Sequence, residues 1–191
     1  MLTMKHLLKR VLATVLVLGF CLPAWAQDIP FVPSPMIVVD RMLELGEVKK
    51  DDIIYDLGSG DGRILIQAAK KYGARGVGID MNPKLVADAT RKAAEEKVSH
   101  LVQFRAADGL TVDISDATVV TLYMFKWFNN QMRPKLQRLK PGSRVVAHDF
   151  AMDEWEPNKV DNVDPKSDPS GELTHARTLY LWSIGTPAQA P

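Results

Sequence analysis

Cysteine is almost absent from this chain of 191 residues, and the one that it has is Cys21. Cys21 lies in an N-terminal segment that we expect to be removed, so the mature chain carries no thiol. Without a thiol there is no disulfide, no cysteine nucleophile and no metal site built from thiolates. Functions that depend on any of these three are therefore excluded.

Apolar runs long enough for a membrane helix are also missing at the N-terminus. The run Val11 to Leu22 has twelve residues, whereas a membrane span needs about 20. Three basic residues precede it, and Ala24-Trp25-Ala26 supplies the small-x-small pattern of a signal-peptidase site. We predict a signal peptide over residues 1–26 and an exported protein, periplasmic or secreted, without a stable membrane span. The alternative is an uncleaved anchor, which would still send the domain out of the cytoplasm.

An excess of charge of one sign is the third absence. The chain has 24 basic and 23 acidic residues, and removing the three basic residues of the first 26 leaves 21 against 23. Such a balance gives no basic footprint for nucleic acid, so we expect no nucleic-acid partner. The remaining 165 residues suffice for one domain with a sizeable core. We place this domain at residues 27–185 and expect residues 186–191 to form a disordered tail.

The most informative stretch is Asp56-Leu57-Gly58-Ser59-Gly60-Asp61-Gly62, which follows an apolar strand and precedes a helical pattern. Glycine is needed where the backbone turns with positive φ or approaches a ligand closely. The helix beyond the loop presents free N–H groups and the positive end of its dipole. Asp80 ends the next predicted strand, where a carboxylate can accept both hydroxyls of a ribose. This combination predicts a site for a nucleotide-type cofactor.

The spacing of the glycines distinguishes two cofactors. The dinucleotide fingerprint is G-x-G-x-x-G, but Arg63 stands where its third glycine would be. An acidic residue before G-x-G-x-G, here Asp56, instead resembles the first motif of class I S-adenosylmethionine-dependent methyltransferases. A NAD-dependent oxidoreductase is the less favoured cofactor hypothesis. A tight turn without any ligand is the other alternative.

Strand and helix patterns alternate along the rest of the chain, which is typical of an α/β fold with a parallel sheet covered on both faces. We expect a doubly wound, Rossmann-like sheet of about seven strands, mostly parallel, with an antiparallel C-terminal hairpin. The expected strands are 53–55, 76–79, 101–104, 117–123, 143–148, 159–163 and 178–184. Four helices are expected. The first covers 34–45, with Ser34-Pro35 as its cap and first turn, and the second covers 64–72. The third starts at Pro83, and the fourth covers 128–139 and is divided in two by Pro134.

Further motifs narrow the resemblance. They are Phe31-Val32-Pro33-Ser34-Pro35, Tyr55 to Arg63, Ala117 to Tyr123, Leu139 to Val146 with His148-Asp149-Phe150, and Leu179-Tyr180-Leu181-Trp182. Together they resemble the ATP synthase c-subunit lysine methyltransferases and their bacterial and archaeal relatives, which are similar to the non-SET protein-lysine methyltransferases. The resemblance implies S-adenosylmethionine as the cofactor and a protein lysine or another amine, on a protein or a small molecule, as the acceptor. The export signal departs from characterised relatives, which modify intracellular or organellar proteins.

The resemblance assigns most of the candidate residues to the cofactor. The loop Gly58, Ser59, Gly60, Asp61 and Gly62 would lie against the methionine moiety, Asp56 would hold its ammonium group, and Asp80 the ribose. Asp108 would lie near the adenine amino group, although an aspartate before Gly109 is also common in turns. Asp61 is alternatively a helix cap. Pro33 and Ser34 belong to a segment that would close over the cofactor as a lid.

Tyr123 is the catalytic candidate, because it ends the fourth predicted strand, where open parallel sheets bind their ligands. Its alternative is an ordinary packing role in the core. His148 and Asp149 end the fifth strand and are weaker candidates, since such a pair is more often structural. Trp127 and Phe128 would line the acceptor channel or simply pack. No metal site is predicted, and a binding module without catalysis is the remaining functional alternative.

Overall fold

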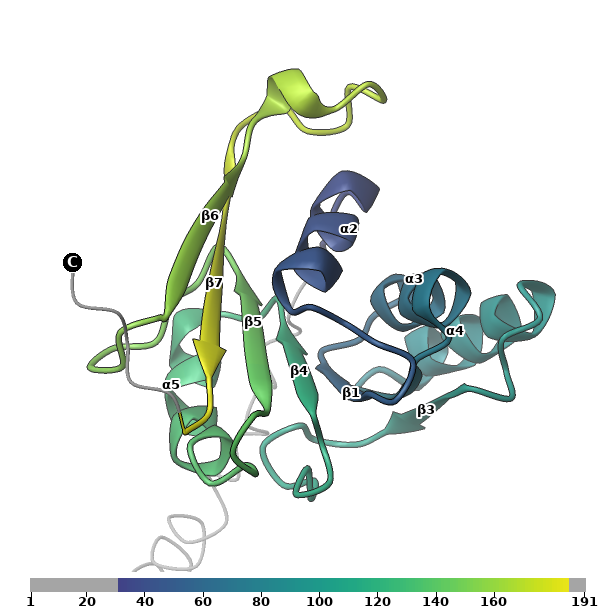
Figure 1. The fold of residues 1–191 in the computed structure, drawn as a ribbon. Coiled ribbons are helices and arrows are strands. Elements are labelled where there is room, and N and C mark those ends of the chain that lie inside the picture. The colour runs from purple at the N-terminus through teal and green to yellow at the C-terminus, as the bar shows by residue number, and fades with distance from the viewer. Residues whose placement is uncertain (1–30, 186–191) are drawn as a thin grey trace, which may run out of the picture. The chain divides into compact units, whose positions relative to one another are not determined.

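The computed structural model describes residues 31–185 (Figure 1). The predicted signal peptide over residues 1–26 and the predicted tail over 186–191 lie outside these residues. The described chain forms one sheet in the order β3-β2-β1-β4-β5-β7-β6, in which β7 runs antiparallel to both β5 and β6 and the other neighbours are parallel. The strands are β1 Ile53–Leu57, β2 Arg75–Asp80, β3 Val102–Ala106, β4 Val119–Leu122, β5 Arg144–His148, β6 Lys159–Val163 and β7 Arg177–Ser183.

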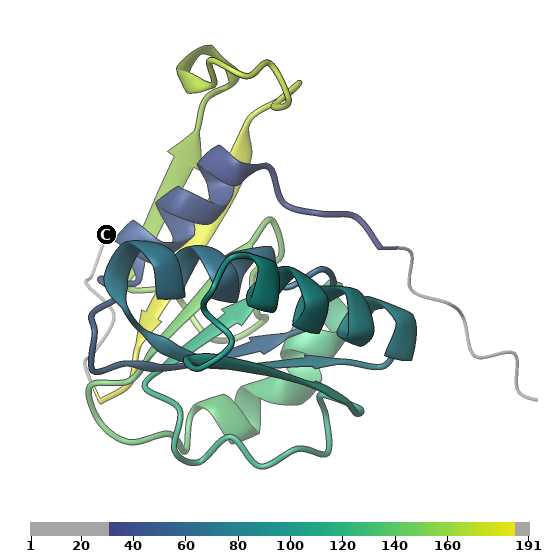
Figure 2. The same cartoon turned by 90° about the vertical axis from the view of Figure 1, so that its right-hand side faces the viewer.

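Helices cover both faces of this sheet. One face carries α2 (Met36–Leu45), α3 (Arg63–Tyr72) and α4 (Pro83–Glu95), and the other carries α5 (Lys126–Leu136), as Figures 1 and 2 show from two directions. Successive strand residues point to opposite faces, so Ile54 packs under the first three helices and Tyr55 packs with α5. None of the helices within residues 31–185 has the length and apolar character that a membrane-spanning helix needs.

The predicted architecture is confirmed: the sheet has seven strands, mostly parallel, with an antiparallel C-terminal hairpin. Most strand boundaries differ from the predicted ones by one or two residues, and β6 begins and ends where expected. The loop between β6 and β7 contains a short 3₁₀ turn, Pro165–Ser167.

The predicted break at Pro134 is wrong, because α5 continues through it from Lys126 to Leu136. Pro134 lies in the last turn of the helix, where the loss of its N–H removes one hydrogen bond close to the end. The side chains of Phe128, Met132 and Leu136 are buried along one face of α5 and hold both ends of the helix on the sheet. Tertiary packing therefore outweighs the local cost of the proline.

The predicted cap at Ser34 is also wrong. The helix α2 begins at Met36, its N-cap residue is Pro35, and no side chain caps it. The hydroxyl of Ser34 instead lies 2.9 Å from the Nδ1 atom of His148, at the end of β5. A distant partner has replaced the local one.

The order of the strands defines where a ligand would bind. The strands β1 and β4 are neighbours, and the helices that follow them, α3 and α5, lie on opposite faces of the sheet. A parallel sheet has a crevice at such a switch point, outside the carboxyl ends of the strands. The loop after β1 and the segment after β4 meet at this point.

Candidate functional site

Two groups of residues flank the crevice. We call the ends of β1 and β2, with Asp56, Gly58, Gly60 and Asp80, the carboxylate side. We call the ends of β4 and β5, with Tyr123, Phe125, His148 and Phe150, the aromatic side. Met124, which follows Tyr123, links the two sides, because its side chain lies against the glycine loop and its sulfur atom would collide with a Cβ added to Gly58.

The glycine loop is fixed by its backbone to the end of β2. The N–H groups of Gly58 and Ser59 donate to the carbonyl oxygen of Ile79 at 2.8 and 3.0 Å, and the N–H of Gly60 donates to a carboxylate oxygen of Asp80 at 2.9 Å. Gly58, Gly60 and Gly62 have positive φ values of 82°, 51° and 78°. This conformation strains other residues, so the loop needs glycine at these positions.

The glycines differ in what surrounds them. Gly58 is exposed, whereas Gly62 is buried and a Cβ there would lie 2.6 Å from Phe104. Gly62 therefore allows α3 to pack closely on the sheet, and Gly58 leaves backbone open to a ligand. The side chain of Ser59 is buried against β2, since its hydroxyl would lie 2.8 Å from a Cβ on Gly78.

Asp56 lies inside β1 and is 2% exposed. Its register partner on β4 is Thr121, whose hydroxyl donates to the carboxylate at 2.7 Å. Burial raises the pKa of Asp56 to about 7, the hydrogen bond from Thr121 opposes this shift, and the charges of Asp80 and Asp61 add to it. The carboxylate is thus short of positive charge, and a cation placed beside it would restore its ionised form.

Asp80 ends β2 at the rim of the crevice. One of its oxygens accepts the N–H of Gly60 and the other accepts the N–H of Asn82, at 2.9 and 2.8 Å. Each carboxylate oxygen keeps a further lone pair for another donor. The position and the chemistry suit a pair of ribose hydroxyls.

Asp61 has a different environment from its two neighbouring carboxylates. It forms ion pairs with Arg63 at 2.9 Å and Lys92 at 2.8 Å. Burial would raise the pKa of Asp61, but the hydrogen bonds from Arg63 and Lys92 outweigh burial and lower it to about 2. It does not occupy the cap position of α3, which belongs to Gly62. Its side chain instead holds Arg63, whose Nη1 donates to the carbonyl oxygen of Ser34 at 2.9 Å.

Asp108 follows β3 in a turn. Its carboxylate accepts the N–H of Leu110 at 2.9 Å, which is the arrangement expected of a turn aspartate. The preceding residue, Ala107, donates its N–H to the carbonyl oxygen of Asp80 at 3.0 Å, so the turn lies next to the end of β2. Its role beside the adenine stays a prediction.

Tyr123 is the first residue after β4 and is half-buried. Its ring stacks on that of His148, with centroids 3.9 Å apart and planes 24° apart. Phe150 lies 6.3 Å from Tyr123 and 6.0 Å from Phe125, the latter being 40% exposed. Burial raises the pKa of Tyr123, so its phenol keeps its proton at neutral pH. The result is a set of rings with one hydroxyl group.

His148 and Asp149 are not a solvent-facing acid–base pair. His148 is fully buried, and burial lowers its pKa to about 4, which keeps the ring neutral. Asp149 has φ of +60°, and its carboxylate accepts from Arg177 at 2.8 Å and from the N–H of Thr178 at 3.0 Å. Of the two predicted channel residues, Phe128 is buried in the core and Trp127 is 49% exposed beside it.

Sequence reasoning missed several residues that build this site. Thr121 is recognisable only from the register between β1 and β4, and Arg63 was noted for the glycine that it replaces, not for its bond to Ser34. Phe125 carries no local motif, and Phe150 stands in the motif His148-Asp149-Phe150 without being marked by it as a site residue. The side chain of Asn129, on α5, fixes the backbone at Phe150 by donating to its carbonyl oxygen at 2.8 Å.

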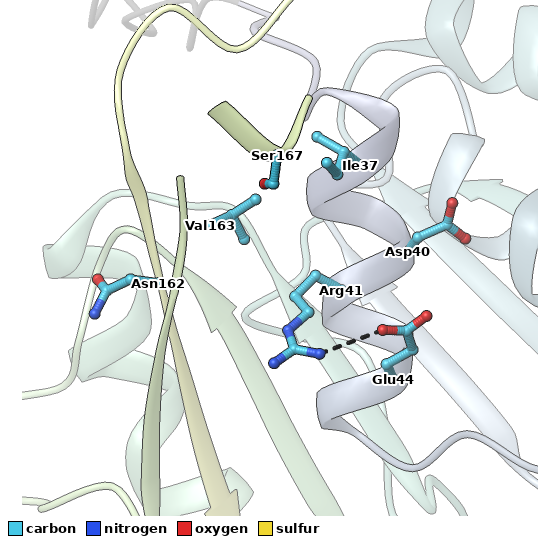
Figure 3. A pocket seen from close by; sticks show the side chains of 7 residues that line it. All are labelled: Ile37, Asp40, Arg41, Glu44, Asn162, Val163 and Ser167. Atoms are coloured by element: carbon cyan, nitrogen blue, oxygen red, sulfur yellow. Dashed lines mark hydrogen bonds and ion pairs between the residues drawn. The ribbon is translucent and has the colours of Figure 1, made fainter. Parts of the chain in front are cut away.

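A separate hollow of about 340 Å³ lies between α2 and the β6–β7 hairpin (Figure 3). The charges around it are paired: Arg41 bonds to Asp161 and Glu44, and Lys71 to Asp40 and Glu44. It lies away from the switch point and is not the candidate site. Over residues 31–185, no cluster of three or more His, Cys, Asp or Glu side chains suits a metal ion.

Comparison with known proteins identifies the family. Residues 56–159, more than half of the chain, match the model of the ANTKMT methyltransferase domain. The chain belongs to this methyltransferase family. A protein-lysine N-methyltransferase from Saccharolobus islandicus is 40% identical over 85% of the chain and 98% of that protein. The human ATP synthase C-subunit lysine N-methyltransferase is 33% identical over 69% of the chain, which spans only 56% of the human protein.

A solved structure agrees with this membership. An RNA methyltransferase from Salinibacter ruber, in complex with S-adenosyl-L-homocysteine, is 48% identical and has a TM-score of 0.71 over 84% of the chain and 97% of its own. The chain is thus a class I, S-adenosylmethionine-dependent methyltransferase. The oxidoreductase and the non-catalytic binding module are not favoured by these relatives.

The residues on the carboxylate side fit S-adenosylmethionine. Gly58 leaves exposed backbone in a conformation that a side chain would strain, and it lies against Met124 of the β4 end. The buried Asp56 needs a positive charge, which the ammonium group of the cofactor carries. Asp80 has lone pairs to spare at the rim.

Proposed function

We propose that the chain transfers a methyl group to the ε-amine of a lysine in a partner protein. The observation that carries the proposal is the aromatic side: a half-buried tyrosine among rings, one residue before Met124, which lies against the exposed glycine of the loop. An aromatic surface of this kind suits the alkyl chain of lysine, and ring faces attract its cation. The names of the lysine methyltransferases from Saccharolobus and human support the same acceptor.

We assign the binding of the cofactor to the carboxylate side. S-adenosylmethionine supplies an activated methyl group on a sulfonium. Asp56 would hold its ammonium group, the backbone of Gly58 and Gly60 its methionine part, Asp80 its ribose, and the turn at Asp108 its adenine. Asp61 would act indirectly, by fixing Arg63 and through it the segment at Ser34. None of these residues needs to move a proton.

The aromatic side then has two tasks. It must present a neutral amine, because a protonated ammonium has no lone pair for the methyl group. Burial among rings lowers the pKa of an amine and favours loss of its proton to solvent. The phenol oxygen of Tyr123 can accept a hydrogen bond from the amine and direct its lone pair toward the crevice. Orientation of the amine and exclusion of water would accelerate methyl transfer, without acid–base catalysis by a charged residue.

The test is methyl transfer from tritium-labelled S-adenosylmethionine by the full-length chain. Three acceptors are compared at equal mass: poly-L-lysine, poly-L-arginine and total bacterial RNA. We expect label in poly-L-lysine alone, located on the ε-nitrogen by mass spectrometry. Label in RNA and none in poly-L-lysine would contradict the proposal and favour the substrate class named for the Salinibacter protein.

We also propose that the protein acts outside the cytoplasm after cleavage behind Ala26. The support is the sequence alone: a basic start, a short apolar run and the Ala24-Trp25-Ala26 pattern. Mass spectrometry of the protein isolated from its native host should find Gln27 as the N-terminal residue, in the exported fraction. Recovery of the uncleaved chain in the cytoplasm would overturn this proposal without affecting the proposed chemistry.

A further inference from the structure

Ser34 is in an unusual position for a serine that precedes a helix. It is 4% exposed, although the residue before it, Pro33, is exposed. A serine at a helix start commonly caps the free N–H groups, but here α2 has no side-chain cap. The hydroxyl instead forms its hydrogen bond with Nδ1 of His148, 114 residues further along the chain. Giving up a local cap for a distant partner suggests that the distant contact has a function.

The backbone of Ser34 is held from the opposite side of the crevice. Its carbonyl oxygen accepts from Nη1 of Arg63 at 2.9 Å. Arg63 is the first residue of α3, directly after the glycine loop, and two of its nitrogens bond to Asp61 at 2.9 Å. Ser34 is therefore bonded both to the start of α3 and to the end of β5.

The hydrogen bond from Ser34 also affects Tyr123, because the ring of His148 stacks on the ring of Tyr123. The groups that face the imidazole are the phenol of Tyr123, the hydroxyl of Ser34, and the charged Asp149 and Arg177. Among the described residues, Nε2 of His148 has no hydrogen-bond partner and lies 3.5 Å from a carboxylate oxygen of Asp149, so Ser34 makes the hydrogen bond that orients the ring. Asp149, which follows, is held at positive φ, a strained conformation that is concentrated at functional sites.

We propose that Ser34 is a positioning residue for methyl transfer, which fixes the ring of Tyr123 through His148 and ties it to the cofactor loop through Arg63. Ser34 would affect the acceptor only indirectly, through the positions of these residues. Loss of its hydroxyl should therefore loosen Tyr123 while the carbonyl bond to Arg63, and with it the loop, remains. The kinetic part of this inference rests on the proposed lysine methylation, and the structural part does not.

The chain offers a matched control for this substitution. Ser143 is 3% exposed and its hydroxyl also makes one buried hydrogen bond, to the carbonyl oxygen of Ala117 at 3.1 Å. It stands just before β5, whereas His148 ends that strand, so the two serines act at opposite ends of β5. Ser143→Ala reports the cost of losing a buried hydroxyl away from the site, and Ser34→Thr tests whether a hydroxyl restores the effect.

The experiment uses the full-length chain with two readouts. The first is the ring ¹H–¹³C spectrum of selectively labelled tyrosine, of which the chain has four, without any ligand. The second is kcat with poly-L-lysine, set against the Kd of S-adenosylhomocysteine. We expect Ser34→Ala to shift the Tyr123 signals and to lower kcat about tenfold, with Kd changed less than twofold. Ser143→Ala should leave all three unchanged, and Ser34→Thr should recover most of the loss.

Unchanged Tyr123 signals in Ser34→Ala would overturn the inference, whatever the activity. An equal loss in Kd and kcat would also overturn it, because Ser34 would then act on the cofactor as a lid residue. If the wild-type chain methylates no lysine, the proposed function fails instead, and the tyrosine spectrum still decides whether Ser34 fixes Tyr123.

Discussion

On the carboxylate side, Asp56, Gly58, Gly60 and Asp80 come from one continuous stretch of sequence, and backbone N–H groups position most of them. On the aromatic side, Tyr123 and Phe150 come from different strand ends, and stacking fixes them. The first side offers charge and hydrogen-bond acceptors, and the second offers apolar surface with one hydroxyl. Under the proposed function, the difference matches the two ligands: a cofactor with fixed polar groups, and an amine that must lose its charge to react.

The first prediction tests whether Asp56 lacks a cation until the cofactor binds. The folded-state pKa of about 7 lies above the ordinary value of 3.8, so the folded chain binds more protons between these values. Its contribution to stability is therefore full at low pH and is lost as pH rises from about 4 to 7. Between pH 5 and 8 the free energy of unfolding of the wild type should fall by about 3 kcal/mol relative to Asp56→Asn.

Urea unfolding of both proteins at the two pH values measures this difference. His148 contributes with the opposite sign, since its lowered pKa makes stability rise with pH between about 4 and 6.5. It is present in both proteins and cancels in the subtraction. Saturating S-adenosylmethionine should abolish most of the difference. If the difference in free energy of unfolding between the two proteins does not change with pH in the absence of ligand, Asp56 is already ionised and paired in the free protein.

The second prediction separates backbone strain from ligand approach in the loop. Gly58→Ala should weaken cofactor binding about 100-fold, because its Cβ enters the space between the loop and Met124 at positive φ. Gly142 has φ of +87° and open space around it, so Gly142→Ala carries the strain alone. Calorimetry with S-adenosylhomocysteine should find unchanged affinity in Gly142→Ala. An equal loss of affinity in Gly58→Ala and Gly142→Ala would show that general destabilisation, and not the approach of the ligand, causes the effect.

The third prediction concerns the rim of the carboxylate side. Asp80→Ala removes the acceptor of the Gly60 N–H and the proposed acceptor of the ribose hydroxyls, which should cost about 2 kcal/mol of cofactor binding. Asp113 is a suitable control, because it also accepts the N–H of the residue two positions on, at 2.9 Å, but lies in the loop before β4. Asp113→Ala should bind the cofactor normally. Normal binding by folded Asp80→Ala would remove Asp80 from the site.

The carboxylate side was largely predictable from the sequence, because its geometry is local. Glycines at alternate positions after a strand, and Asp80 at the end of the next strand, determine the loop through short-range bonds. The same local rules gave the sheet, since alternation of strand and helix leaves few arrangements. They could not reveal that Asp61 pairs with Lys92, which depends on how α4 packs beside the glycine loop.

On the aromatic side, Tyr123 and, as a weaker candidate, His148 were predictable, because the ends of β4 and β5 mark the ligand edge of the sheet. Tertiary contacts decide which residues meet there. The order of the strands brings His148 to Tyr123, Asn129 of α5 holds the backbone of Phe150, and the path of the chain before α2 brings Ser34 to His148. The two wrong predictions, the break at Pro134 and the cap at Ser34, have the same origin. In each, packing or a distant hydrogen bond outweighs a local preference.

The central claim is that the two sides have separate tasks, and Tyr123→Phe tests it most directly when measured beside Asp80→Ala. For each full-length variant, the Kd of S-adenosylhomocysteine and kcat with poly-L-lysine are determined at saturating cofactor. The account predicts about tenfold lower kcat and unchanged Kd for Tyr123→Phe, because its hydroxyl acts on the amine in the transition state. It predicts a raised Kd with nearly normal kcat for Asp80→Ala. Loss of cofactor affinity in Tyr123→Phe, with kcat preserved, would contradict it.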